Sequence, residues 1–232
     1  MMDHKVLIEK YPFLYHMADA NSWNGILKYG LLSTSKLLDL FEISGTKREQ
    51  IEANVRVNSI LLTHPIHGTA VIRDNKVMPR WQLELKQLAN GQPCLLNNLT
   101  PEQWCQMLNE RVFLWLSWGR LQRLLNARSY KKKEHLIMTF SSEKIINDYK
   151  DDIELSPINT GCTLPYPHFS RGRETFLSIS DYPYEDWRRK RKNSSTEPVV
   201  ELTIKGSVKD VKKYLVRVDL MQGDQIINEL FP

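Results

Sequence analysis

The sequence predicts an α+β fold, with helices concentrated in residues 20–110 and strands in residues 111–220. Two observations support this prediction. Apolar residues at helical spacing and β-branched or aromatic runs follow one another without the regular strand–helix alternation of a parallel sheet. The 232 residues, 41% of them hydrophobic, are enough for one substantial core. We therefore expect one domain, residues 1–232, with a short C-terminal tail at 221–232.

Composition narrows the class of protein. The longest apolar runs stop well short of the roughly 18 residues of a membrane span, and the N-terminus has no apolar signal region. Cys94, Cys105 and Cys162 are an odd number without CxxC spacing, which argues against a disulfide framework. These features favour a cytoplasmic protein without membrane contact. The net charge of +5 is modest, but much of it lies in two basic runs, Lys131–Lys133 and Arg188–Lys192.

Local signals place most of the elements of the N-terminal half. Residues 11–15 form a short apolar run that predicts a strand with His16 at its exit. A helix from Trp23 should end at Gly30, and Thr46 with Glu49 forms a capping-box pattern. Further signals indicate helices in "STSKLLDLFEIS", "WQLELKQLANG" and "LTPEQWCQMLNE", and a hairpin of "SILLTH" and "TAVIRD" around "PIHG".

The C-terminal half contains more strand signals. Strands are expected in "RVFLWLSW", "HLIMTF", "ETFLSIS", "VVELTI" and "YLVRVDL", and helices in "GRLQRLLNAR", "SSEKIINDYK" and "YEDWRRKRK". The segment "SPINTGCTLPYPHFSRGRE" has no periodicity, and a long irregular loop inside a compact domain is more often functional than not.

The sequence lacks the motifs of several common kinds of nucleotide-binding and catalytic site. The sequence has no GxxxxGK[ST], no GxGxxG after a strand and no GxSxG. His64 and His67, joined by Asp74 or His16, would be a candidate metal site, but their spacing is not that of a zinc-binding helix, and we expect no metal. A metal-dependent hydrolase using His64 and His67 stays open as an alternative.

The remaining polar candidates centre on Glu174. This residue begins an apparent strand directly after Arg171 and Arg173, where a carboxylate can be held ionised for proton abstraction. The competing interpretation is a solvated glutamate paired with one of these arginines. The other candidates are His16, Arg73 and Arg111.

Two family resemblances join these pieces. The whole chain resembles an uncharacterised bacterial domain family, through "HPIHGTAVIRD", "LSPINTG" and "RGRETF". Locally, Tyr15–His16, "NSWNGILKYGLLS", "RVFLWLS" and "RETFLSI" resemble the DarT-like ADP-ribosyltransferases. The second resemblance implies a split antiparallel β-sandwich with peripheral helices, which binds NAD as a substrate.

The resemblance also implies roles for individual residues. His16 would hold a ribose hydroxyl of NAD, Glu174 would be the catalytic glutamate, and Arg73, or alternatively Arg111, the catalytic arginine. Trp115 or Phe113 would replace the aromatic residue that stacks on nicotinamide, or would belong to the core. The implied NAD-binding residues are His16, Tyr15, Arg111, Trp115, Ser117, Asn159, Arg171 and Arg173.

The resulting hypothesis is an NAD-dependent ADP-ribosyltransferase-like toxin or defence protein that modifies nucleic acid or protein and has an antitoxin or immunity partner. DNA or RNA would bind at Lys131–Lys133 and Arg188–Lys192, since basic residues beside Tyr182, Tyr184 and Trp187 suit phosphates and bases. The alternative, besides the hydrolase, is a non-catalytic nucleic-acid-binding module with the same fold.

Overall fold

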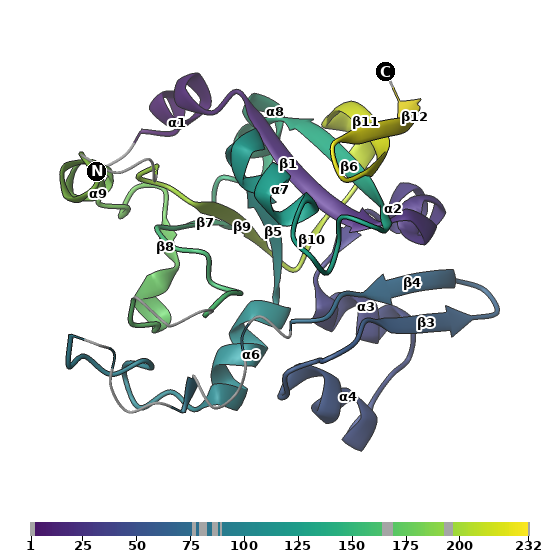
Figure 1. Ribbon diagram of the computed structural model, residues 1–232, viewed down its shortest axis with the longest axis horizontal. Helices are drawn as coiled ribbons and strands as arrows, with labels where there is room; N and C mark the ends of the chain where they lie inside the picture. Colours follow the sequence, from purple (N-terminus) through teal and green to yellow (C-terminus); the bar gives the residue numbers. More distant parts are fainter. Residues whose placement is uncertain are drawn as a thin grey trace.

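The computed structural model describes residues 3–75, 78, 83–84, 88, 90–163, 169–192 and 197–231. Eight strands form one antiparallel sheet in the order β12-β11-β6-β1-β5-β9-β7-β8 (Figure 1). Its strands are β1 (Phe13–Asp19), β5 (Arg111–Trp115), β6 (Glu134–Ser141), β7 (Ile153–Ser156), β8 (Leu177–Ser178), β9 (Glu201–Lys205), β11 (Leu215–Gln222) and β12 (Gln225–Phe231). Two small sheets pair β2 (Leu31–Leu32) with β10 (Ser207–Val208) and β3 (Ile60–His64) with β4 (Gly68–Ile72).

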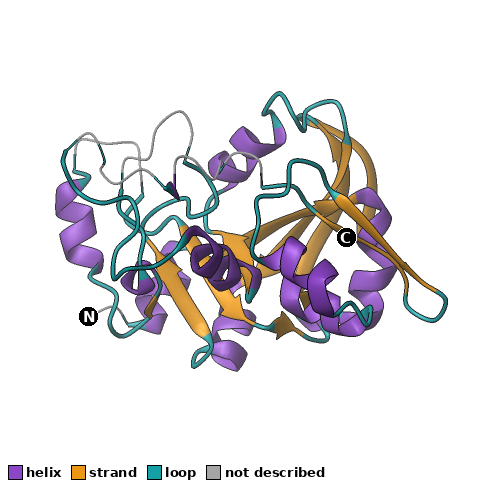
Figure 2. Cartoon of the chain, turned by 90° about the horizontal axis from the view of Figure 1, so that it is seen from below, coloured by secondary structure: helices purple, strands orange, loops and turns teal. Residues whose placement is uncertain are grey.

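Helices lie on both sides of the large sheet (Figure 2). The helices of the described residues are α1 (His4–Lys10), α2 (Trp23–Tyr29), α3 (Thr34–Leu40), α4 (Gly45–Glu52), α6 (Pro101–Asn109), α7 (Trp118–Leu125), α8 (Ser142–Tyr149) and α9 (Tyr184–Lys190). Mixed helices and a large antiparallel sheet confirm the α+β class. The eight strands belong to one sheet, in which β1 and β5 share a single residue pair. The sandwich description that the family resemblance implied stays a prediction. None of the helices in the described residues has both the length and the hydropathy of a membrane span.

Local end signals account for several of these helices. The Ser33 hydroxyl caps α3, and Thr100 forms a capping box with Gln103 at the start of α6. Gly30 ends α2 with φ +86°, and a Cβ there would lie 2.2 Å from the Val208 carbonyl oxygen. A residue with a side chain would clash with this backbone, so glycine is required at position 30.

Other expectations were wrong. Thr46 does not start a helix, because α4 begins at Gly45 with Ser44 as its N-cap residue. His16 is not at a strand exit, because β6 pairs with β1 along its whole length and extends it to Asp19. Residues 221–232 are not a tail, since β11 continues to Gln222 and β12 pairs with it. Most of the expected helix at 81–91 lies outside the described residues, and the single domain stays a prediction.

The segment after Arg171 also differs from the expected strand. Arg173–Thr175 is a 3-10 turn, in which the Gly172 amide donates to the Thr175 hydroxyl and the Thr175 amide donates to the Gly172 carbonyl. Only Leu177–Ser178 pairs as a strand, at the edge of the sheet. Glu174 therefore lies on an exposed turn.

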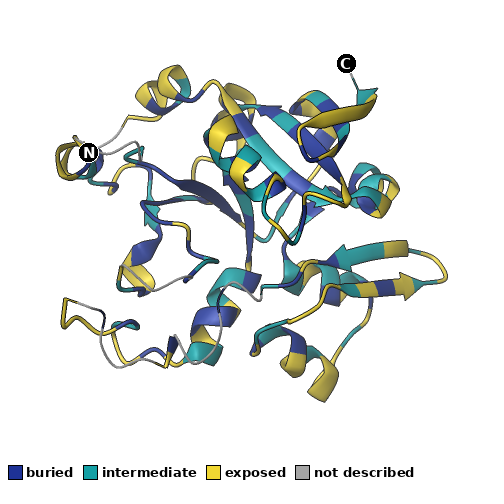
Figure 3. Ribbon diagram, viewed as in Figure 1, coloured by how far each residue is buried: buried dark blue, intermediate teal, exposed yellow. Residues whose placement is uncertain are grey.

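Burial varies from strand to strand across the large sheet. Strands β5, β7 and β9 are mostly buried, whereas β12 and parts of the β3–β4 hairpin are exposed (Figure 3). The main core cluster packs β1, β5, β6, β7 and β9 against α1, α2 and α8. A second cluster joins α3 and α4 to the hairpin through Leu38, Phe41, Ile51, Leu62 and Ile72. The hairpin is thus packed through its own core beside the large sheet.

Candidate functional site

The two halves of the large sheet meet at one narrow point. Strand β1 pairs with β6 over seven residues, and β5 pairs with β9 over five, but β1 and β5 share the single pair Tyr15–Trp115. Trp115 in turn lies opposite Glu201 on β9. Since β1 and β5 separate beyond Tyr15–Trp115, the sheet has an opening between its halves.

A cavity of about 630 Å³ occupies this opening. Two neighbouring residues of each strand line it, His16 and Met17 on β1 and Val112 and Phe113 on β5. Its volume lies within the roughly 300–1,000 Å³ typical of ligand sites.

His16 bridges the opening. Its Nδ1 lies 2.9 Å from the carbonyl oxygen of Phe113 on β5. A carbonyl oxygen can only accept, so Nδ1 carries the proton and Nε2 keeps its lone pair. Burial lowers the pKa of His16 to about 4, and the nearby charge of Arg73 acts in the same direction. The ring is therefore neutral at pH 7 and can accept a hydrogen bond at Nε2.

Glu201 is the buried acid of the cavity. It begins β9, a strand paired on both sides, and is 3% exposed. Its Oε2 accepts from the amide and the hydroxyl of Thr160, at 3.1 and 2.7 Å. Burial raises the pKa of Glu201 to about 7, against the opposing effects of Thr160 and of the Arg120 and Arg171 charges. Glu201 can therefore exchange a proton near neutral pH.

Cationic side chains surround these two residues. Among the described residues, those that line the cavity are Arg56, Arg73, Arg111, Arg120, Arg123 and Lys133. Arg111 is paired with Glu154 at 2.8 Å, and Arg120 lies 3.4 Å from Glu197. Within the described part of the chain, no carboxylate lies in ion-pair range of Arg56 or Arg73. The cavity is therefore suited to an anionic ligand.

The structure brings only some of the predicted site residues together. Those that line the cavity are His16, Arg73, Arg111, Trp115 and Asn159. Tyr15, Ser117 and Arg171 are not among its lining residues, and Arg171 is buried, with its guanidinium donating to the carbonyls of Phe169 and Cys162. Glu174 and Arg173 are exposed on their turn and do not line it either.

Glu201 and its partner Thr160 were not among the site residues expected from the sequence. A signal was present, because "VVELTI" also places a glutamate at the start of a strand. Its pairing with both β5 and β7 is not visible in the sequence. His135, which lines the cavity and lies 3.2 Å through Nε2 from the Tyr130 carbonyl, was also missed.

The histidine pair of the hairpin is packed within the fold. His64 and His67 stack with ring centroids 4.4 Å apart, and His67 Nδ1 lies 2.8 Å from the Tyr29 hydroxyl. No group of three histidine, cysteine, aspartate or glutamate side chains suited to a metal occurs among the residues that the structure describes.

The two basic runs have different environments. In α9, Arg188 pairs with Glu185 and Arg189 with Asp186, while Arg191 is buried against backbone carbonyls. Lys131–Lys133 is exposed, and Lys133 lines the cavity. Of the two basic runs, Lys131–Lys133 is therefore the one in contact with the cavity.

Comparison with known proteins gives one family. A family model matches residues 12–215. The chain belongs to this family of unknown function (DUF7002). No curated protein matches this DUF7002 chain. Among solved structures, it is similar to Thermosipho africanus DarTG in complex with ADP-ribose, with 14% sequence identity and a TM-score of 0.44. The likeness covers 88% of this chain and 43% of that one, so the chain spans less than half of that protein.

Proposed function

We propose that this DUF7002 chain is an NAD-dependent ADP-ribosyltransferase-like enzyme whose catalytic glutamate is Glu201. The observation that carries the proposal is one cavity, between two separating strands, lined by a neutral histidine and a buried glutamate. The motif resemblance assigned the glutamate to Glu174, but Glu201 is the strand-initial glutamate that lies with His16 at the cavity.

His16 would hold the dinucleotide in place. Its Nε2 can accept from a ribose hydroxyl, because Nδ1 is committed to Phe113. Arg73 is the candidate catalytic arginine and, with no described carboxylate in ion-pair range, has its charge available for the diphosphate. Trp115, directly opposite Glu201, offers an aromatic surface for a planar ring.

Glu201 would act on the nicotinamide ribose. The bond between C1′ and the nicotinamide nitrogen breaks, and nicotinamide leaves with the electron pair. The positive charge that develops at C1′ and the ring oxygen is stabilised by the nearby carboxylate. The acceptor then attacks C1′, and Glu201 takes up the proton that the acceptor releases. A pKa of about 7 suits the uptake of this proton, whereas stabilisation of the positive charge requires the ionised form of Glu201.

The acceptor we favour is a nucleic acid, in keeping with a toxin or defence role opposed by an antitoxin or immunity partner. Lys133 links the cavity to the exposed Lys131–Lys133 run, which could neutralise phosphates beside the site. The same run supports a non-catalytic nucleic-acid-binding module as the second candidate. That module would bind DNA or RNA in a salt-dependent way and be insensitive to Glu201→Gln.

Calorimetric titration with NAD and a nicotinamide-release assay test the proposal. The wild-type chain should bind NAD, and His16→Leu should weaken binding about tenfold or more. Glu201→Gln should keep NAD affinity within about threefold but reduce nicotinamide release about 100-fold or more. Glu174→Gln is the matched control and should behave as wild type. No NAD affinity up to millimolar concentration would contradict the proposal.

A further inference from the structure

The cavity has an apolar arm that the proposed chemistry does not use. The residues of this arm come from the segments of α2, β2, α3 and β4, and they belong to the main core cluster or the hairpin cluster. Its walls include the aliphatic and aromatic side chains Ile26, Leu31, Leu37, Phe41, Ala70 and Ile72. Side chains of this kind hold an aliphatic chain better than a sugar or a phosphate.

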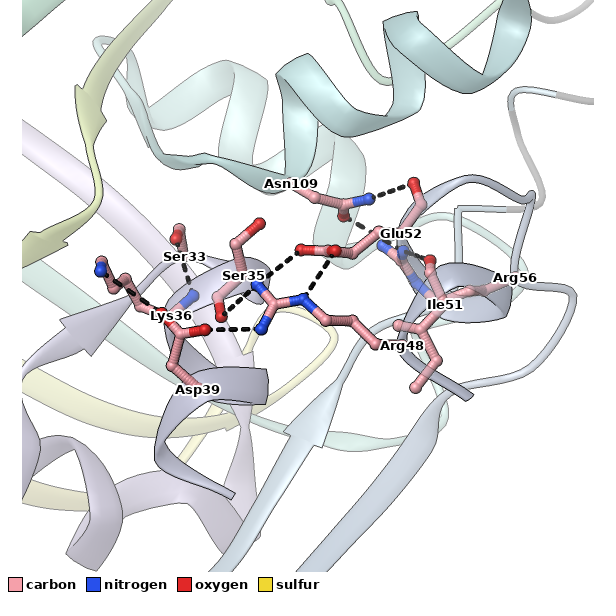
Figure 4. A network of polar contacts seen from close by, with 9 residues as sticks. All are labelled: Ser33, Ser35, Lys36, Asp39, Arg48, Ile51, Glu52, Arg56 and Asn109. Carbon is pink, nitrogen blue, oxygen red and sulfur yellow. Dashed lines mark hydrogen bonds and ion pairs between the residues drawn. The ribbon is translucent and has the colours of Figure 1, made fainter. Parts of the chain in front are cut away.

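Arg56 is the charged residue beside this arm. Its guanidinium donates to the Ile51 carbonyl at 2.8 Å and to the Asn109 side-chain oxygen at 3.1 Å (Figure 4). Ile51 packs with Phe41 and Ile72 in the hairpin cluster, which places Arg56 next to the apolar walls. Figure 4 also shows Asn109 donating to the Glu52 carbonyl. The side chain of Asn109, which accepts from Arg56, is therefore itself held in place.

Among the residues that the structure describes, no carboxylate forms an ion pair with the Arg56 guanidinium. Its hydrogen bonds go to neutral oxygens, including the Arg73 carbonyl at 3.2 Å. Asp74 also lines the cavity; burial lowers the pKa of Arg56, and the charge of Asp74 acts in the opposite direction. Nearby Arg48, by contrast, pairs with Asp39 and Glu52. A partly buried cation that lines a cavity can bind an anionic group of a ligand.

We propose that the apolar arm and Arg56 form a binding site for an amphipathic carboxylate, a ligand with an aliphatic chain and an anionic head group. The chain lies between α2, α3 and β4, and the carboxylate is bound by Arg56. The site does not depend on NAD binding or on Glu201, so it goes beyond the proposed function.

Titration of the wild-type chain with straight-chain carboxylates from hexanoate to decanoate, without NAD, tests the site. Each buried methylene should raise affinity about fourfold until the arm is full. Octanoate should bind about tenfold or more tightly than 1-octanol, which lacks the charge. Affinity that does not change with chain length would overturn the proposal, and equal affinity for octanoate and 1-octanol would overturn the role of Arg56.

Variants separate the two parts of the site. Arg56→Met should weaken octanoate about tenfold and leave 1-octanol unchanged. Ala70→Phe, which fills the arm, should weaken both ligands. Arg188→Met removes an exposed arginine of α9 and should change neither. If Arg56→Met binds octanoate as wild type does, the head-group assignment is wrong. The wild-type chain-length series decides the proposal even if a variant fails to fold.

Discussion

Two glutamates of this chain begin segments that are alike in sequence and unlike in structure. Glu174 starts "ETFLSI" and Glu201 starts "ELTI". Glu201 lies in a strand paired with β5 on one side and β7 on the other, and is buried. Glu174 lies on an exposed turn before a two-residue edge strand. The difference shows that neighbours in the sheet, not the local pattern, decide which carboxylate is placed in the cavity.

The largest expected effect is a pH dependence due to Glu201. Burial raises its pKa from 4.5 to about 7. Between these pH values the unfolded chain releases the proton and the folded chain keeps it, so the free energy of unfolding falls as pH rises. The loss is about 3 kcal/mol, complete above pH 7 and absent below pH 4.5. Denaturant unfolding of wild type and Glu201→Gln across this range measures it.

The titration of His16 also changes the stability of the wild type with pH, so the effect of Glu201 must be measured as a difference between wild type and Glu201→Gln. Its pKa is lowered from 6.5 to about 4, so it stabilises the fold above pH 6.5 and that stability is lost as pH falls. This dependence has the opposite sign and partly masks that of Glu201 in the wild type. It is common to both proteins and cancels in their difference. A pH-independent difference would contradict the environment assigned to Glu201.

The next effect concerns the junction between the two halves of the sheet. His16→Leu removes the donor to the Phe113 carbonyl, and leaving such a group unpaired costs about 2 kcal/mol. Urea unfolding at pH 7.5 measures this loss. His4→Leu, an exposed change in α1, is the control and should stay within about 0.5 kcal/mol. Equal effects of the two variants would show that His16 does not hold the halves together.

A smaller effect is expected at Thr160. Thr160→Val removes the 2.7 Å hydroxyl bond to Glu201 and keeps the backbone bond. At pH 8 the variant should lose about 1 kcal/mol, since the ionised carboxylate loses one donor. The pH at which stability levels off should also move upward, because the Thr160 hydroxyl lowers the pKa of Glu201. A loss that is the same at pH 4 and pH 8 would indicate a packing effect instead.

The smallest effect is expected at the other glutamate. Glu174→Gln should change the free energy of unfolding by less than about 0.5 kcal/mol, because the residue is exposed. Thermal unfolding at pH 5 and pH 8 checks that the change is equally small at both. A large change in the free energy of unfolding at either pH would indicate that Glu174 is buried as Glu201 is, which would contradict the contrast between the two residues.

Features that depend on near neighbours along the chain could be predicted from the sequence. Ser33 and Thr100 start helices, and Gly30 ends one. The turn of the β3–β4 hairpin lies in the expected segment "PIHG", between His64 and Gly68. These interactions span a few residues, so their signals can be read locally.

The residues that form the site could not be predicted in this way, because they come together through contacts between distant segments. His16 is in mid-strand because β6 extends β1, and it reaches β5, about a hundred residues later, through the Phe113 carbonyl. Glu201 rather than Glu174 lines the cavity because two distant strands bury β9. Burial and pKa depend on such pairing between segments far apart in the chain, which a local pattern does not encode.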